Sequence, residues 1–96
     1  MLLEFARYAT DKLHRYNAFY LHNTLFPSEE LVLEKMGDKA VLVRRVAVRE
    51  YGKYLSQADD EKVALYLSSL NTLTPAARNE CLHNAPSHPL VQEYCA

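Results

Sequence analysis

The chain has no tryptophan, and its 96 residues include only two glycines, two cysteines and four prolines. The two glycines, Gly37 and Gly52, lie far apart, which excludes a glycine-rich phosphate-binding loop. No segment approaches the roughly 18 consecutive apolar residues of a transmembrane helix. The sequence therefore predicts neither a nucleotide-binding loop nor a membrane span.

The first residues also lack the features of a secretory signal. Only three apolar residues precede Glu4, without a basic start or a long apolar run. Two cysteines in a chain without such a signal are typical of a reducing compartment with free thiols. We therefore expect a cytoplasmic protein.

Charges of the two signs are nearly balanced, with 11 Lys and Arg against 12 Asp and Glu, for a net charge of −1. This balance argues against a general nucleic-acid binder, which carries a clear basic excess. Apolar residues make up 49% of the chain, which is typical of a globular protein rather than a disordered one. We predict a single domain over residues 1–96. Its small size limits its stability to about 5 kcal/mol, so a homodimer or an obligate partner remains open.

Apolar residues recur at steps of three and four from the start of the chain, which predicts one long helix from Leu2 to Leu25. The stripe expected to face the core consists of Leu2, Phe5, Ala9, Leu13, Tyr16 and Tyr20. Phe26 and Pro27 should end this helix, because proline disfavours helical geometry in the residue before it.

The next segment has two interpretations. In the first, Ser28 caps a short helix over 29–36 that closes at Gly37 in a left-handed conformation, and Asp38 caps a helix over 39–55. In the second, the valine-rich residues 31–48 form a β-hairpin, since β-branched residues favour strands. The capping residues favour the helical interpretation.

Three further helices are expected in the second half, each preceded by a side chain suited to cap its first turn. The first runs from about Asp60 to Leu70, with Asp59 or Asp60 as its cap. The second runs from Pro75 to His83 after Thr74, and the third runs from Pro89 to Tyr94 after Ser87. The prediction is an all-α, single-domain bundle of five to six helices, with an α+β fold as the alternative if 31–48 is a hairpin.

The segment from Asp38 to Lys53 holds five cations and two anions. If it is helical, Arg45, Arg49 and Lys53 lie one turn apart in a single row. Arginine matches carboxylate or phosphate oxygens two at a time, so this row and Arg44 can contact an acidic surface. A solvated helix face is the alternative.

Aromatic side chains are a second signal, with seven tyrosines and three phenylalanines. Aromatic residues and arginine are enriched at binding hot spots. We therefore predict that Phe19, Tyr51 and Tyr54 anchor the contact between the basic side chains and the acidic surface. The alternative is that these rings pack inside a domain that is short of core residues.

The C-terminal segment contains Cys81, His83, His88 and Cys95, which are the only candidates for a metal site. Their spacing matches none of the usual zinc-ligand pairs, so we predict no metal and no cofactor. Pro86 and Pro89 have the P-x-x-P spacing and are weak candidates for contact with a prolyl isomerase, but helix boundaries explain both prolines better.

No nucleophile, base or acid pair in the sequence has the spacing of a catalytic site, so the sequence predicts a protein that is not an enzyme. The function that we predict is a small cytoplasmic protein-binding modulator that docks on a larger protein with an acidic surface. Inhibitors, adaptors, immunity-type proteins and phage-encoded host modulators have this profile. The alternative is a small transcriptional regulator that holds DNA or RNA against residues 39–53.

Overall fold

A computed structural model describes residues 2–83 and 88–95, apart from the side chain of Cys95. These residues form seven α-helices and one 3-10 helix. In chain order the elements are α1 (Leu2–Tyr8), α2 (Lys12–Leu25), α3 (Glu29–Lys35), α4 (Val41–Tyr51), η1 (Gly52–Gln57), α5 (Asp60–Leu70), α6 (Pro75–His83) and α7 (Pro89–Cys95). The all-α prediction is confirmed, with slightly more helices than the five or six expected. No strand occurs in the part of the chain that the structure describes, so the hairpin alternative is wrong.

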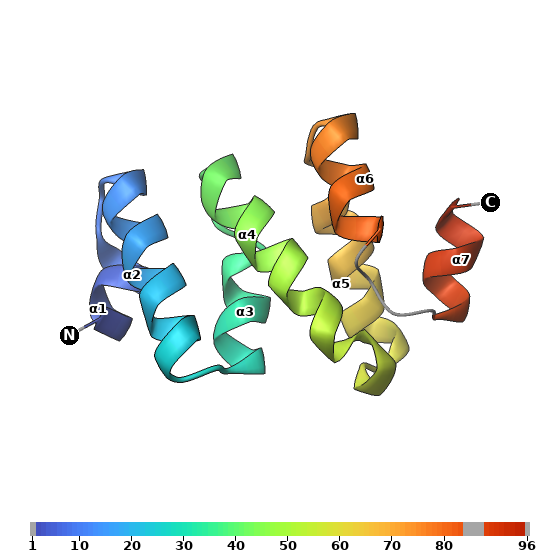
Figure 1. The fold of residues 1–96 in the computed structure, drawn as a ribbon, viewed down its shortest axis with the longest axis horizontal. Helices are drawn as coiled ribbons and strands as arrows, with labels where there is room; N and C mark the ends of the chain where they lie inside the picture. Colours follow the sequence, from blue (N-terminus) through green and yellow to red (C-terminus); the bar gives the residue numbers. More distant parts are fainter. Residues whose placement is uncertain (1, 84–87, 96) are drawn as a thin grey trace.

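The helices follow one another along the longest dimension of a body measuring 40 × 25 × 20 Å. The helices α1 and α2 lie at one end and α7 at the other (Figure 1). Between them, α4 contacts α2, α3, α5 and α6. It is buried on most of its circumference, through Val43, Val46, Ala47, Val48 and Tyr51. The valine-rich segment is therefore the centre of the core.

Three of the predicted N-caps are confirmed, and each satisfies an amide of the first helical turn. The Ser28 hydroxyl accepts a hydrogen bond from the Leu31 amide, the Asp59 carboxylate accepts one from Lys62, and the Thr74 hydroxyl accepts one from Ala77. In addition, α2 ends at Leu25, directly before Phe26 and Pro27, as predicted.

The prediction of one helix from Leu2 to Leu25 is wrong, because the chain turns between Tyr8 and Lys12. The carboxylate of Asp11 accepts hydrogen bonds from the amides of Leu13 and His14, at 2.8 and 3.3 Å. It therefore caps a new helix, and α1 folds back against α2.

The turn also changes which face of α2 is buried. The core face contains Arg15, Ala18, Phe19 and Asn23, whereas Leu13 and Tyr20 from the predicted stripe are exposed. The predicted stripe assumed one continuous helix. Its residues belong to two helices, α1 and α2, and the predicted core face was therefore wrong.

The connection from α3 to α4 also differs from the prediction. Gly37 does not adopt a left-handed conformation, since no described glycine has a positive φ. The Asp38 carboxylate accepts from the Ala40 amide, and the helix begins two residues later than expected, at Val41. After Tyr51 the chain tightens into η1, so the predicted helix over 39–55 is an α-helix followed by a 3-10 helix.

At the C-terminal end, α7 begins at Pro89, and the Nδ1 atom of His88 accepts a hydrogen bond from the Leu90 amide. The cap predicted at Ser87 lies outside the described residues, as does Pro86. Pro89 occupies the first helical position, where its missing N–H costs nothing. The prolyl isomerase contact stays a prediction.

Candidate functional site

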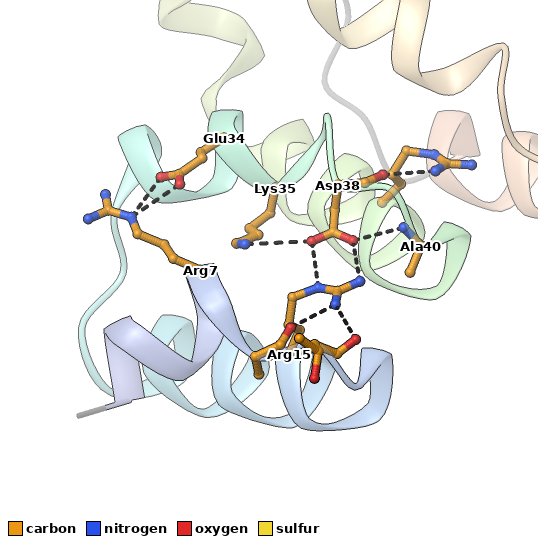
Figure 2. A network of polar contacts seen from close by, with 9 residues as sticks. Arg7, Arg15, Glu34, Lys35, Asp38 and Ala40 are labelled. Atoms are coloured by element: carbon orange, nitrogen blue, oxygen red, sulfur yellow. Dashed lines mark hydrogen bonds and ion pairs between the residues drawn. The ribbon is translucent and has the colours of Figure 1, made fainter.

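A buried ionic network joins α2 to the connection between α3 and α4 (Figure 2). Arg15 donates from Nε to Oδ2 of Asp38 at 3.1 Å and from Nη2 to Oδ1 at 3.0 Å. Its Nη1 donates to the carbonyl oxygens of Ala9 and Thr10, at 2.8 and 3.0 Å. One guanidinium group therefore fixes the α1–α2 turn against the start of α4.

The Asp38 carboxylate has no free hydrogen-bonding direction left for a substrate. It also accepts from the Ala40 amide at 2.8 Å, and Nζ of Lys35 lies 3.5 Å from Oδ2. Burial acts to raise the pKa of Asp38, but hydrogen bonds from Arg15 and Ala40 and the charges of Arg15 and Lys35 outweigh burial and lower this pKa. The carboxylate therefore stays ionised and stabilises the fold rather than exchanging protons.

Arg44 is committed to the same region. Its Nη1 donates to the carbonyl oxygen of Asp38 at 2.8 Å, and its Nε donates to the Thr72 hydroxyl at 3.0 Å. The side chain lines a cavity of about 550 Å³ between α3, α4 and α5. Arg44 thus ties these helices together, and it is less available to a partner than the sequence suggested.

This cavity offers hydroxyl groups, and Lys39 is the one amine in its lining. Ser68, Ser69 and Thr72 line it, and the Ser69 hydroxyl donates to the carbonyl oxygen of Met36 at 2.6 Å. Its lining contains no histidine, cysteine or glutamate, and its one carboxylate, Asp38, is held by Arg15. A hydroxyl nucleophile needs an adjacent base, and the hydrogen bonds of Ser69 and Thr72 go to Met36, Arg44 and the Ser69 carbonyl oxygen, not to Lys39 or Asp38.

The other three predicted cations form an exposed group, which we call the basic row: Arg45, Arg49 and Lys53 on α4 and η1. Arg45 pairs with Glu80 of α6 at 3.0 Å and Lys53 with Glu50 at 3.1 Å, with the side chains of the two cations 52% and 69% exposed. Arg49 lies between them and forms no ion pair or hydrogen bond with any residue that the structure describes. The structure therefore leaves all three predicted cations on the surface, Arg45 and Arg49 on α4 and Lys53 on η1.

Two of the three predicted aromatic anchors are not on the surface. Phe19 and Tyr51 are fully buried, because this small domain without tryptophan fills its core with these rings. The Tyr51 hydroxyl donates to Oε2 of Glu29 at 2.9 Å, and burial together with this hydrogen bond raises its pKa. Tyr54 is half-buried, with its ring centroid 5.6 Å from that of Tyr51, and it alone remains available at the surface.

The structure describes three of the four C-terminal candidates for metal ligands, and these three are not grouped into a site. Cys81 is a free, buried thiol whose pKa is raised by burial, His83 is exposed, and Nδ1 of His88 is used as a helix cap. The side chain of Cys95 lies outside the described residues. Among the side chains that are described, no three of His, Cys, Asp or Glu are grouped so that they could hold a metal ion.

The sequence did not predict a set of exposed apolar side chains on α1, on α2 and directly after α2, which we call the α1–α2 surface. Its members are Phe5 (56% exposed), Leu13 (54%), Leu21 (46%), Leu25 (56%) and Phe26 (64%). Isolated exposed leucines are normal, and of this set Phe5 and Leu21 line a common shallow hollow. A signal was present in the spacing of Leu13, Leu21 and Leu25, which fall on one face of α2.

Comparisons with protein-family models, with curated proteins and with solved structures found no match for this chain. None of the helices that the structure describes has both the length and the apolar composition needed to cross a bilayer.

Proposed function

We propose that this protein is a small protein-binding modulator that docks on a larger protein through the basic row. The observation that carries the proposal is the position of Arg49, an exposed cation without a carboxylate partner among the described residues. It lies one α-helical turn after Arg45, and Lys53 follows four residues later, in η1. A partner with acidic side chains at matching intervals would complete these interactions.

The two ion pairs that flank Arg49 present little obstacle to docking. Exposed ion pairs contribute about 0–1 kcal/mol each, so carboxylates of a partner can replace Glu50 and Glu80 at small cost. Arginine binds a carboxylate with two parallel hydrogen bonds, which adds geometric specificity. Tyr54, half-buried next to Lys53, supplies an aromatic edge of the kind enriched at hot spots.

The polar clusters inside the fold also support an action by binding rather than by catalysis. The Arg15–Asp38 pair and the Arg44 contacts stabilise the junctions between helices. The protein would therefore act by covering or altering a surface of its partner, as an inhibitor, an adaptor, an immunity-type protein or a phage-encoded host modulator does.

Affinity capture with charge-reversed variants tests this proposal. The wild-type protein should recover a stoichiometric protein partner from cell extract, with a higher yield at low salt than at moderate salt. Arg49→Glu should weaken this binding by about tenfold or more, because it places a like charge against the partner's acidic surface. Lys39→Glu is the matched control, since it makes the same charge change at another exposed position on the molecule.

Two outcomes would overturn the proposal. One is the recovery of no stoichiometric protein at either salt concentration. The other is the recovery of DNA or RNA whose affinity falls steeply with salt and is lost in Arg49→Glu, which would instead support the nucleic-acid regulator.

A further inference from the structure

A hollow of about 450 Å³ lies between the α1–α2 turn and the start of α4, and its charged lining is entirely basic. Its volume is in the range of small-ligand sites. The lining includes Thr10 and the cations Lys12, Arg15 and Lys39, together with the first residues of α4. None of the described residues that line it carries a carboxylate, although the whole chain has a net charge of −1. The hollow therefore concentrates positive charge.

The side chains of the two lysines have no partner in the described part of the chain. Lys12 begins α2, Lys39 precedes α4, and both are exposed without an ion pair or a side-chain hydrogen bond. The neighbouring carboxylates are used elsewhere, because Asp11 caps α2 and Asp38 is held by Arg15. Both ammonium groups are therefore open to an external anion.

The guanidinium group of Arg15 also has an N–H to offer, although this residue is only 3% exposed. Four of its five N–H groups donate to Asp38, Ala9 and Thr10. The second N–H of Nη2 has no acceptor among the described residues. Figure 2 shows this group between α2 and Ala40, at the start of α4. A buried donor without an acceptor is uncommon and indicates that an acceptor binds here.

The start of α4 adds two backbone donors. Ala40 has the extended backbone of an N-cap residue, with φ −94° and ψ 128°, but its methyl group cannot accept a hydrogen bond. The amides of Val41 and Leu42 therefore have no acceptor among the described residues. The dipole of this 11-residue helix adds positive potential at the same end. These amides supplement the three cations, since phosphate groups bind at helix starts.

We propose that this hollow binds the phosphate group of a small molecule. Its donors come from the α1–α2 turn, from α2 and from the start of α4. A phosphate group offers at least three acceptor oxygens and nearly two negative charges, whereas a carboxylate offers two oxygens and one charge. The two ammonium groups, the guanidinium N–H, the Thr10 hydroxyl and the two amides are more donors than one carboxylate can use. A phosphate group therefore matches this lining better.

Titration with inorganic phosphate, followed by NMR of the backbone amides, tests the proposal. We expect the amide resonances of Val41 and Leu42 to shift until they saturate, whereas sodium chloride at the same ionic strength should not shift them. Methyl phosphate distinguishes the sources of the group. Binding at least as tight as that of inorganic phosphate indicates a phosphate ester, and weaker binding indicates free phosphate. The absence of a saturable shift up to about 50 mM of either compound would overturn the proposal.

A neutralised lysine tests the basic lining. Lys39→Gln should weaken phosphate binding by about tenfold, because one charge-assisted hydrogen bond is lost. Lys62→Gln is the matched control, since it removes the same charge at the other end of α4, where Glu29 accepts from both Lys62 and Tyr51. This control should leave the affinity unchanged. Equal losses in the two variants would show that the net charge of the chain, and not this hollow, attracts phosphate.

An added cap tests the start of α4. Ala40→Asp places a carboxylate where it can accept from the free amides, so it should abolish phosphate binding and raise the melting temperature. A variant that lost binding by unfolding would instead have a lower melting temperature. Phosphate binding that persists in Ala40→Asp would overturn the assignment to this hollow.

Phosphate binding should be separable from docking on an acidic partner. The basic row lies on α4 and η1 with Arg45 paired to α6, whereas the hollow lies beside α2. Lys39→Glu should therefore lose phosphate and keep the partner, and Arg49→Glu should lose the partner and keep phosphate. A short DNA duplex that shifts the amides of Val41 and Leu42 at a far lower phosphate concentration than inorganic phosphate does would assign the hollow to nucleic acid. That result would overturn the small-molecule proposal.

Discussion

Arg15 and Asp38 form a two-point ion pair across 23 positions of sequence, with their side chains only 4% and 5% exposed. Removing two charges from water is costly, and the attraction between them offsets this cost only where the geometry is good and the remaining hydrogen bonds are satisfied. Both conditions hold here, because Arg15 also donates to two carbonyl oxygens and Asp38 also accepts from an amide. The junction between the α1–α2 unit and the rest of the fold depends on this pair.

Loss of one member of the pair should be strongly destabilising. Asp38→Ala leaves the cations Arg15 and Lys35 buried without a counter-charge, and we expect the free energy of unfolding to fall by about 3–5 kcal/mol. Urea unfolding followed by circular dichroism measures this loss. Glu34→Ala is the control, because it breaks the more exposed Arg7–Glu34 pair and should cost less than about 1 kcal/mol. Equal losses in the two variants would contradict this account of the network.

Acid should weaken the fold through the same carboxylate. The pKa of Asp38 is lower in the folded chain than its ordinary value of 3.8, so the folded state binds the proton less tightly than the unfolded state. The stabilisation is complete above about pH 5, where the carboxyl is ionised in the unfolded chain as well, and it is lost progressively as the pH falls towards the folded-state pKa. Unfolding free energies measured from neutral to acidic pH should show this decline. The decline should be shallower in Asp38→Asn, and an unchanged slope in that variant would exclude Asp38 as a cause.

The hydroxyl of Tyr51 should stabilise the fold without taking part in binding. Tyr51→Phe removes its hydrogen bond to Glu29, and we expect the free energy of unfolding to fall by about 1–2 kcal/mol. Tyr54→Phe is the matched control and should change this free energy by no more than about 0.5 kcal/mol. Thermal unfolding of the two variants checks the difference, while affinity capture should recover the same partner with Tyr51→Phe as with the wild type. Loss of the partner in this variant would show that Tyr51 contributes to the contact.

Features that depend on neighbouring residues could be predicted from the sequence. The caps at Ser28, Asp59 and Thr74 each satisfy an amide three residues away, so the relevant partners lie within a short window. The missed cap at Asp11 is equally local, but apolar residues at helical spacing on both sides of it, from Phe5 and Ala9 to Leu13, predicted one continuous helix. The prediction therefore placed Asp11 within that helix and not as the cap of a new one.

Burial of the candidate binding residues could not be predicted in this way, because it depends on distant contacts. Arg44 turns inward to Thr72, 28 positions away, and Tyr51 reaches Glu29, 22 positions away. Helical spacing predicted Arg45, Arg49 and Lys53 in one row, and the structure leaves all three exposed, with Lys53 in η1 rather than in the same α-helix. The partner of the buried Arg15 on α2 is Asp38, 23 positions away, which no pattern within α2 itself indicates.

The order of the helices in space has a consequence for how quickly the chain reaches its native state. Each helix mainly contacts the helices next to it or one place further along the chain, as in α1–α2, α3–α4, α4–α5 and α5–α7. Short loops must close to make these contacts, and small helical domains of such topology fold in microseconds to milliseconds. A slower folding phase would therefore reflect proline isomerisation or the association of two chains. Only association would become faster as the protein concentration rises.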